Sequence, residues 1–131
     1  MTETEVEIVE EKKVDNKIPV HSLNELLMKQ AHEVGAPRIR PVREKTGSTD
    51  FGNVMHRIPG TCARVAFVGE QAASHSQEYL DAGKTEEAHH AILYGAKMIA
   101  GAARELIDQP ELLEAVQKEF QENLRKETTE F

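Results

Sequence analysis

The sequence has 131 residues and a formal net charge of -7 at pH 7, with 39% hydrophobic and 30% charged residues. This length fits one small domain or part of a larger one, and the acidic balance argues against a nucleic-acid or anionic-membrane partner. We find neither a stretch long enough for a transmembrane helix nor a signal-peptide pattern, so a cytoplasmic location is the simplest expectation. A single cysteine, Cys62, excludes an internal disulfide, and its apolar neighbours predict a buried thiol.

The first third of the chain predicts a strand, a helix and a second short strand. Residues 2–10 alternate between acidic and other side chains, which is the period-two pattern of a half-buried strand. Residues 22–25 (Ser-Leu-Asn-Glu) have the form of a capping box and predict a helix start, and Gly35 predicts the end of that helix. The second strand is predicted over residues 38–43.

The rest of the chain predicts a buried strand over residues 61–68 (TCARVAFV), a polar loop over 69–84, and two helices. Thr85 is the expected cap of the first helix, and the second is expected to start at Asp108. The expected apolar stripe of the first helix is Ala88, Ala91, Ile92, Gly95, Met98, Ile99, Ala102 and Leu106. Helices that alternate with strands predict an α/β architecture, although so few elements make only half of such a domain.

Five of the six histidines have contexts that do not favour a ligand role. His89 and His90 are adjacent on one predicted helix, point about 100° apart and cannot chelate one metal ion together. His21 precedes a predicted cap, and His32 lies late in its helix, where a protonated imidazole suits the helix dipole. We interpret His21 and His32 as structural or exposed, and we expect one of the two adjacent histidines to lie on a solvated helix face and the other to pack. His56 follows a glycine-bearing loop, and a place in a cleft stays open for it.

Two loops are the candidate functional segments. His75 lies in the middle of the long polar loop after a predicted strand, where α/β proteins place ligands. A catalytic zinc ion prefers imidazole and carboxylate ligands and needs at least three from the protein. Residues 47–53 (GSTDFGN) fit either a capped helix start or a substrate loop whose hydroxyl and N–H groups face an anion or amide, and periodicity does not choose between them.

Taken together, the two loops resemble segments of a known family. Residues 47–54 (GSTDFGNV), with Pro59 following, resemble a loop of the amidohydrolase branch of metallopeptidase family twenty, the branch of peptidase M20-like domain protein 2 and aminobenzoyl-glutamate utilisation protein B. Residues 75–79 (HSQEY) and 82–89 (AGKTEEAH) resemble the family segment His-Thr-Pro-Glu-Phe followed by Ala-Gly-Thr-Glu-Glu-Ala-His. The similarity covers nearly the whole chain.

The resemblance implies the C-terminal part of a three-layer, zinc-peptidase-like α/β catalytic domain, preceded by the last strand of a lid domain that mediates homodimerisation. Residues 1–17 would be the lid strand and its connector, 18–126 the catalytic part and 127–131 a frayed tail. His75 would be the last of five ligands to two zinc (or similar divalent) ions, and it would point into the same cavity as the loop that borders the substrate. The implied substrate-loop residues are Gly47, Ser48, Thr49, Asp50 and Asn53.

The other metal ligands and the catalytic glutamate of the family correspond to sequence upstream of the portion present here. A metal-bound water needs a carboxylate to accept its proton, and one imidazole cannot hold a catalytic zinc, so we expect this chain alone to hydrolyse nothing. The expected function is a fragment or split subunit of a hydrolase of dipeptides or N-acyl amino acids, with the missing N-terminal catalytic and lid portions as partners. The alternatives are a non-catalytic binding or regulatory module and an accidental likeness.

Three departures from the family pattern leave the substrate open. Met55 stands where the family usually has serine after Asn-Val, and residues 62–64 (Cys-Ala-Arg) stand where it often has Ile-His-Pro. Gln77 replaces the common proline near the ligand histidine.

Overall fold

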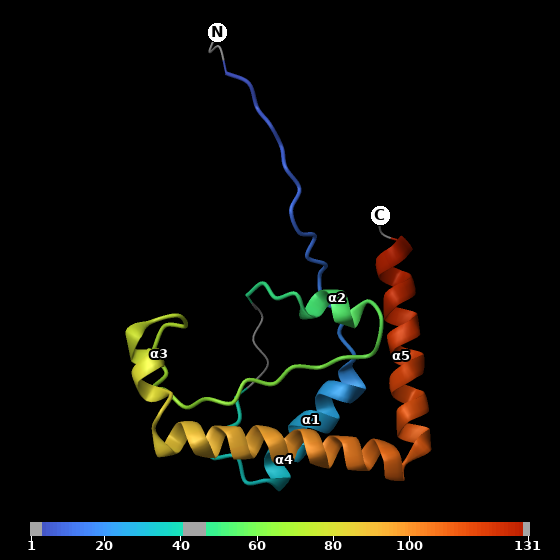
Figure 1. Ribbon diagram of the computed structural model, residues 1–131. Coiled ribbons are helices and arrows are strands. Elements are labelled where there is room, and N and C mark those ends of the chain that lie inside the picture. Colours follow the sequence, from blue (N-terminus) through green and yellow to red (C-terminus); the bar gives the residue numbers. More distant parts are fainter. Residues whose placement is uncertain (1–3, 41–46, 130–131) are drawn as a thin grey trace.

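The computed structural model describes residues 4–40 and 47–129. Within these residues the regular elements are five helices: α1 (His21–Glu33), α2 (Phe51–Met55), α3 (Gln77–Ala82), α4 (Glu86–Asp108) and α5 (Pro110–Thr129). The helical body consists of α1, α4 and α5, each of which packs against the other two, and the chain changes direction between α4 and α5 (Figure 1). No helix in the described part is long and apolar enough to span a bilayer.

The core lies where the three long helices meet. Val116 and Phe120 of α5 are almost fully buried, and so are Ile18 and Val20 from the segment that leads into α1. The rest of the core cluster is Leu23, Leu26, Leu27, Ala31, Met55, Met98 and Ala102. In the described residues no buried side-chain nitrogen or oxygen lacks a hydrogen-bond partner. The body therefore has a closed hydrophobic centre with satisfied polar groups around it.

The N-terminus of α1 corrects the capping-box prediction. The helix begins two residues earlier than a Ser22 cap predicts, at His21, and its N-cap residue Val20 makes no side-chain cap. Glu119 of α5 supplies the missing acceptor: its carboxylate accepts from the backbone N–H of His21 (2.6 Å) and of Ser22 (3.0 Å), and from the Ser22 hydroxyl (2.5 Å). A carboxylate at this helix end is also favoured by the helix dipole. A distant helix thus replaces the local cap.

The predicted ends of the other long helices are largely confirmed. Gly35 follows α1 with a φ of 70°, the left-handed conformation expected just past a helix end. The Thr85 hydroxyl accepts from the N–H of Ala88 at 3.3 Å and caps α4. The last helix begins at Pro110, two residues after the predicted start, and continues to Thr129, which includes the first residues of the predicted tail. Residues 130–131 lie outside the described residues.

The predicted stripe of α4 is confirmed only in part. Its small residues Ala88, Ala91 and Ala102 are buried together with Met98, whereas Ile92 and Ile99 are each 67% exposed. The prediction merged two faces of one helix, because apolar residues cover more of the circumference of α4 than a single contact requires.

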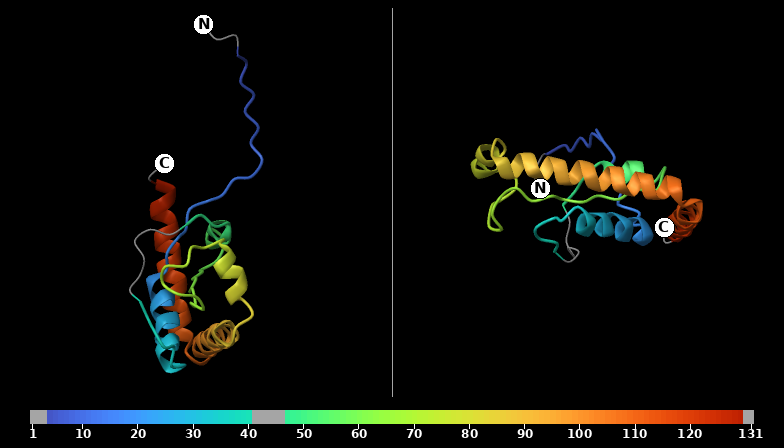
Figure 2. Two further views of the ribbon diagram at one scale, coloured as in Figure 1. Left: turned by 90° about the vertical axis from the view of Figure 1, so that its left-hand side faces the viewer. Right: turned by 90° about the horizontal axis from the view of Figure 1, so that it is seen from below.

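The predicted strands are not formed in the described residues. Residues 4–10 extend away from the body as an exposed arm (Figure 1), and residues 61–68 run as irregular chain along α4 (Figures 1 and 2). A strand needs a hydrogen-bonded neighbour, and among residues 4–40 and 47–129 no strand forms beside either segment. Cys62 is exposed, so the prediction of a buried thiol is wrong. Residues 41–43 of the strand predicted over 38–43 lie outside the described residues. The α/β fold class stays a prediction.

Candidate functional site

His75 is exposed, at the turn that leads into α3. Its φ is 65°, and it is the one non-glycine residue with a positive φ in the described part of the chain. The next residue, Ser76, caps α3 by accepting from the N–H of Tyr79 at 3.3 Å. The Tyr79 ring meets Phe67 edge to face, with centroids 4.9 Å apart, and this contact holds α3 against the 61–68 segment. A left-handed L-residue costs about 1–2 kcal/mol, so this histidine sits in a strained turn.

The loop of residues 47–50 leads directly into α2, so the helix start that the structural interpretation expected is present, but its N-cap residue Asp50 makes no side-chain cap. The Thr49 hydroxyl accepts from the N–H of Phe51 at 3.3 Å, and Thr49 is half-buried, whereas Gly47 and Ser48 are exposed. Asp50 forms an ion pair with Lys12 at 3.0 Å on the surface. The hydrogen bond from the Lys12 ammonium lowers the pKa of the Asp50 carboxyl from its ordinary value, with a further contribution from its charge. The loop is therefore fastened to the segment that precedes α1.

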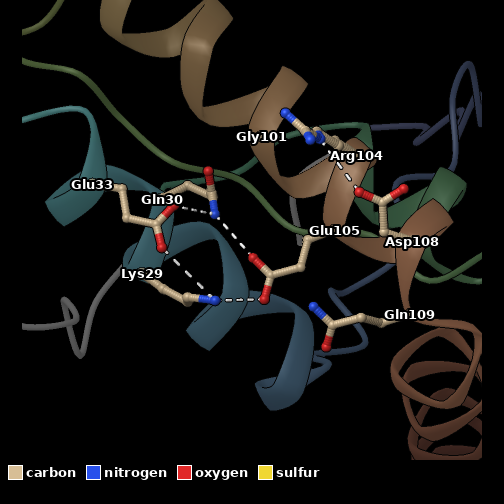
Figure 3. Close-up of a pocket in the computed structure, with 8 residues that line it drawn as sticks. All are labelled: Lys29, Gln30, Glu33, Gly101, Arg104, Glu105, Asp108 and Gln109. Carbon is tan, nitrogen blue, oxygen red and sulfur yellow. Dashed lines mark hydrogen bonds and ion pairs between the residues drawn. The ribbon is translucent and has the colours of Figure 1, made fainter.

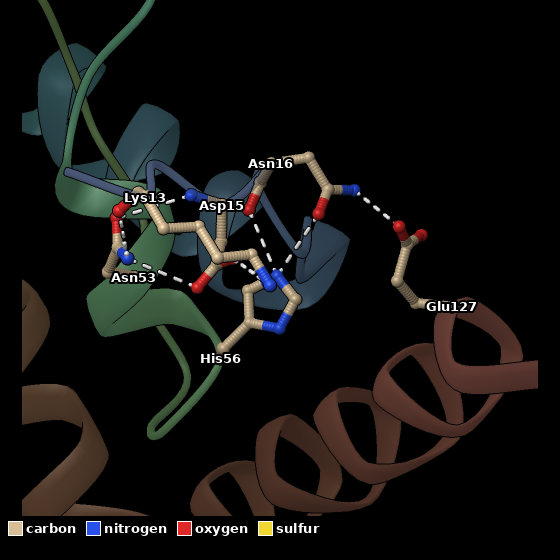
Figure 4. Close-up of polar contacts among 6 residues, drawn as sticks. All are labelled: Lys13, Asp15, Asn16, Asn53, His56 and Glu127. Atoms are coloured by element: carbon tan, nitrogen blue, oxygen red, sulfur yellow. Dashed lines mark hydrogen bonds and ion pairs between the residues drawn. The ribbon is translucent and has the colours of Figure 1, made fainter. Parts of the chain in front are cut away.

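Asn53 and Gly52 of α2 both contact the segment that precedes α1, and Figure 4 shows the contacts of Asn53. The Asn53 amide donates to the carbonyl of Lys13 (3.2 Å) and to a carboxylate oxygen of Asp15 (3.1 Å), and its oxygen accepts from the N–H of Asp15 (3.3 Å). A Cβ on Gly52 would lie 2.1 Å from the Asp15 carbonyl oxygen, so only glycine allows this approach. Asn53, a predicted substrate residue, is thus already occupied in positioning the loop.

The His56 side chain contacts the segment that precedes α1. Its Nε2 lies 3.2 Å from the Asn16 carbonyl oxygen and 3.1 Å from the Asn16 side-chain oxygen, while the Asn16 amide donates to Glu127 of α5 at 2.7 Å (Figure 4). Two oxygen neighbours require Nε2 to carry the proton. No local sequence pattern predicts these contacts, because the residues that make them lie up to 111 positions apart.

The two candidate segments lie on the same side of the molecule. In Figures 1 and 2, α2 and α3 lie on one side of α4, spread along the direction of its axis. The described residues contain no group of three histidine, cysteine, aspartate or glutamate side chains placed to hold a metal ion. The residues present therefore do not fit a catalytic zinc by themselves, because such a site needs at least three protein ligands.

The remaining histidines are exposed. His89 and His90 are both exposed on α4, so the prediction that one of them packs is wrong, and His32 is exposed in the last turn of α1 as one of its two interpretations expected. His21 is exposed, and its backbone N–H donates a hydrogen bond to Glu119.

A pocket of about 370 Å³ opens between α1 and α4 (Figure 3), and none of its lining residues belongs to the predicted site. Its walls are polar, and Glu105 is their centre: it accepts from Lys29 at 2.5 Å and from Gln30 at 3.1 Å. The hydrogen bond from Lys29 lowers the pKa of Glu105, and the same bond raises the pKa of Lys29. The donors and acceptors at this centre are paired with one another. These hydrogen bonds connect α1 to α4.

The sequence is similar to dipeptidases. It is 33% identical over 115 residues to the Xaa-Arg dipeptidase of Homo sapiens, a match that covers 86% of this chain and 26% of that protein. It is 39% identical over 82 residues to the Xaa-Arg dipeptidase of Mus musculus, covering 63% of this chain and 19% of that protein. The chain thus spans about a quarter or less of these curated relatives. No family model matches, and no solved structure matches. These similarities support a relation to the dipeptidases of metallopeptidase family twenty.

Proposed function

We propose that this chain contributes part of the active site of a metal-dependent hydrolase of dipeptides or N-acyl amino acids, with His75 as a ligand of a divalent metal ion. The observation that carries the proposal is the backbone of His75. It is an exposed imidazole held at a φ of 65°, inside a segment that resembles the metal-binding segment of the family. Strained backbone that surrounding structure maintains is typical of functional sites.

The proposal requires further polypeptide, because the described residues hold no three-ligand group. The curated relatives have about four times the length that the chain matches, so they have ample sequence for the other ligands and the catalytic base. The chain would then be the C-terminal part, or a separate subunit, of a two-domain α/β enzyme that binds zinc and acts as a homodimer in the cytoplasm. On its own the chain is expected to be inactive.

Within the substrate loop, the contacts divide the predicted residues into two groups. Asp50 and Asn53 bind the segment around residues 12–15, so they position the loop. Ser48 is exposed and Thr49 half-buried at the end of the loop, where a hydroxyl or backbone N–H can meet a substrate carboxylate. We propose that the substrate contacts Gly47, Ser48 and Thr49. Asp50 and Asn53 would hold the loop in position.

One observation favours a second candidate, a non-catalytic binding module. The helical body has a closed core of its own, built around Val116 and Phe120, while the ligand set is incomplete. Such a body can persist as a folded unit without chemistry. The two candidate functions differ in one respect: whether His75, in the turn before α3, binds a metal ion when the missing sequence is supplied.

The test is a chimera in which this chain replaces the matched 115 residues of the human Xaa-Arg dipeptidase. We expect it to bind a divalent metal and to hydrolyse dipeptides, with Xaa-Arg dipeptides as the first substrates to assay. His75→Ala should lower metal affinity and kcat/KM by at least about 100-fold, because second-layer changes alone cost 10- to 100-fold. His90→Ala is the matched control and should change neither. Equal metal content and activity with and without His75 would refute the ligand role.

A further inference from the structure

Asp15 belongs to none of the predicted site segments, yet it contacts α2 in three ways. Its backbone N–H donates to the side-chain oxygen of Asn53 at 3.3 Å, and one of its carboxylate oxygens accepts from the Asn53 amide at 3.1 Å (Figure 4). Its carbonyl oxygen lies against Gly52, where a Cβ would approach within 2.1 Å. Two hydrogen bonds in opposite directions and a close backbone contact fix the distance between Asp15 and α2 and the orientation of the Asn53 side chain.

The Asp15 side chain is partly protected from water, unlike the lysines before it. It is 29% exposed, whereas the side chains of Lys12 and Lys13 are 67% and 81% exposed. A hydrogen bond that is shielded from water is stronger than one in open solvent, and a carboxylate acceptor strengthens it further. The ion pair of Lys12 with Asp50 lies on the surface, where such pairs contribute little. Asp15 therefore makes the stronger polar contact of this segment with α2.

The support behind Asp15 is the core of the helical body. Ile18 and Val20 follow within five residues and are 2% and 0% exposed. The side-chain amide of Asn16 donates to Glu127 of α5 at 2.7 Å. Three residues of chain span at most about 11 Å, so Asp15 cannot move far from the buried Ile18. Asp15 thus connects α2 to the hydrophobic centre of the body.

The short helix α2 is held from two sides. It has five residues, and isolated helices of this length are not stable in water. Phe51 and Met55 pack toward the core. At 100° per residue, Asn53 lies on the opposite side of the helix from both, and there it meets Asp15. The core on one side and Asp15 on the other together fix the orientation of α2.

Local hydrogen bonds join the loop of residues 47–49 to α2. The Thr49 hydroxyl accepts from the N–H of Phe51 at 3.3 Å, and the Thr49 carbonyl oxygen accepts from the N–H of Gly52 at 3.5 Å. A shift of α2 therefore carries this loop with it. A misplacement of about 1 Å in a group that positions substrate can cost as much as about 100-fold in activity.

We propose that Asp15 is a positioning residue for the loop of residues 47–49: through Asn53 and Gly52 it fixes the orientation of α2, and α2 holds the loop where it meets the substrate. This inference rests on the proposed function, because that proposal gives the loop its substrate. Asp15 acts on the substrate only through α2. Its loss weakens substrate binding and leaves metal binding by His75 unchanged, because His75 lies in a different turn, before α3.

The first experiment uses the whole chain and requires no activity. Hydrogen exchange at the amides of Asn53 and His56, which are hydrogen-bonded within α2 and its first turn, measures how often α2 opens. Asp15→Ala removes the carboxylate acceptor, so we expect these amides to exchange about 10-fold faster. Glu11→Ala removes an exposed carboxylate from the same segment and is the matched control, with an expected change of less than about 3-fold. Equal exchange in the two variants would overturn the proposal.

A reciprocal exchange of side chains tests the contact itself. Asn53→Asp places a second carboxylate beside Asp15 and removes the donor, so exchange of the α2 amides should be at least about 10-fold faster. Adding Asp15→Asn restores a donor opposite an acceptor, and this double variant should return to within about 3-fold of the unchanged chain. Asp15→Asn alone keeps an acceptor oxygen and should stay within about 3-fold as well. A double variant that exchanges as fast as Asn53→Asp alone would contradict the proposed contact.

The last experiment measures kinetics in the chimera with the human Xaa-Arg dipeptidase. Asp15→Ala should raise KM about 10-fold and change kcat less than about 3-fold, because the loop supplies binding that substrate and transition state share. The metal content should stay unchanged. A fall in kcat or in metal content at constant KM would overturn the positioning role. If the chimera is inactive with and without Asp15, the proposed function fails, while hydrogen exchange in the chain alone still decides whether Asp15 positions α2.

Discussion

The helical body and the loop region, residues 47–84, are held in place by different forces. The body buries complete apolar side chains such as Val116 and Phe120 between its helices. In the loop region, α2 adds Met55 to the hydrophobic core and is also held by the amide of Asn53 and the close approach of Gly52, whereas no residue from 61 to 84 is buried. The turn that carries His75 therefore lies in the part with the least hydrophobic support, and we expect this part to have a lower local stability than the body.

The largest expected effect tests this contrast directly. Phe120→Ala removes an almost fully buried ring from the body and should lower the free energy of unfolding by about 3–5 kcal/mol. Tyr79→Ala removes the edge-to-face contact with Phe67 and should lower it by about 1 kcal/mol or less. Urea unfolding followed by circular dichroism measures both. Equal losses would mean that the loop region is part of the same cooperative core.

The attachment of α2 gives the second prediction. In Gly52→Ala the new Cβ meets the Asp15 carbonyl oxygen, which is backbone and cannot swing away, so we expect a loss of about 1–3 kcal/mol and detachment of residues 13–16. Gly47→Ala is the matched control, because nothing lies within 4 Å of its new Cβ. Proteolysis near residues 13–16 should accelerate in the first variant alone. If both variants behave alike, the close approach does not hold the loop.

The third prediction concerns Glu119, which fastens the start of α1. Partial burial raises the pKa of Glu119, but the hydrogen bonds from Ser22 and His21 outweigh this effect, and the pKa lies below its ordinary value of 4.5. Its contribution is therefore complete above pH 4.5 and is lost as pH falls through the lowered pKa. Glu119→Gln should cost about 1 kcal/mol at pH 7, and this cost should be smaller at pH 3, because the carboxyl becomes protonated as the pH falls through its lowered pKa.

The control for this prediction is Glu122→Gln, an exposed position on the same helix, for which we expect a change within about 0.5 kcal/mol at either pH. A cost at position 119 that is the same at pH 7 and pH 3 would show that packing, and not the charge at the helix end, stabilises this contact.

Local sequence patterns predicted the helices well because their signals are local. Thr85 and Gly35 act within a few residues of their own position, and both roles are confirmed. The capping box at residues 22–25 is replaced by Glu119, almost a hundred residues away, which accepts from both the N–H and the hydroxyl of Ser22. The strand predictions depended on neighbours, and the period-two pattern of residues 4–10 says which face would be buried without saying what would bury it.

For the candidate site, the sequence indicated the segments but not their supports. The loop of residues 47–53 and the turn at His75 were both singled out, and the structure brings α2 and α3 to one side of α4. Neither the contact of Gly52 with residue 15 nor the positive φ of His75 has a local signature, because each depends on chain that folds over it or follows it. The metal-ligand and substrate roles stay predictions.

The smallest expected effect concerns the strained turn itself. His75→Gly removes the penalty of a left-handed L-residue, so this variant should be more stable than His75→Ala by about 1 kcal/mol locally. Since α3 is held by few contacts, the gain should appear as slower hydrogen exchange of the α3 amides rather than as a shift in global unfolding. His90→Gly against His90→Ala is the control, and there glycine should be the less stable by about 1 kcal/mol, because His90 lies inside a helix. The same order of stability at both positions would show that the turn at His75 relaxes in solution, and that its strain cannot serve to aim the imidazole.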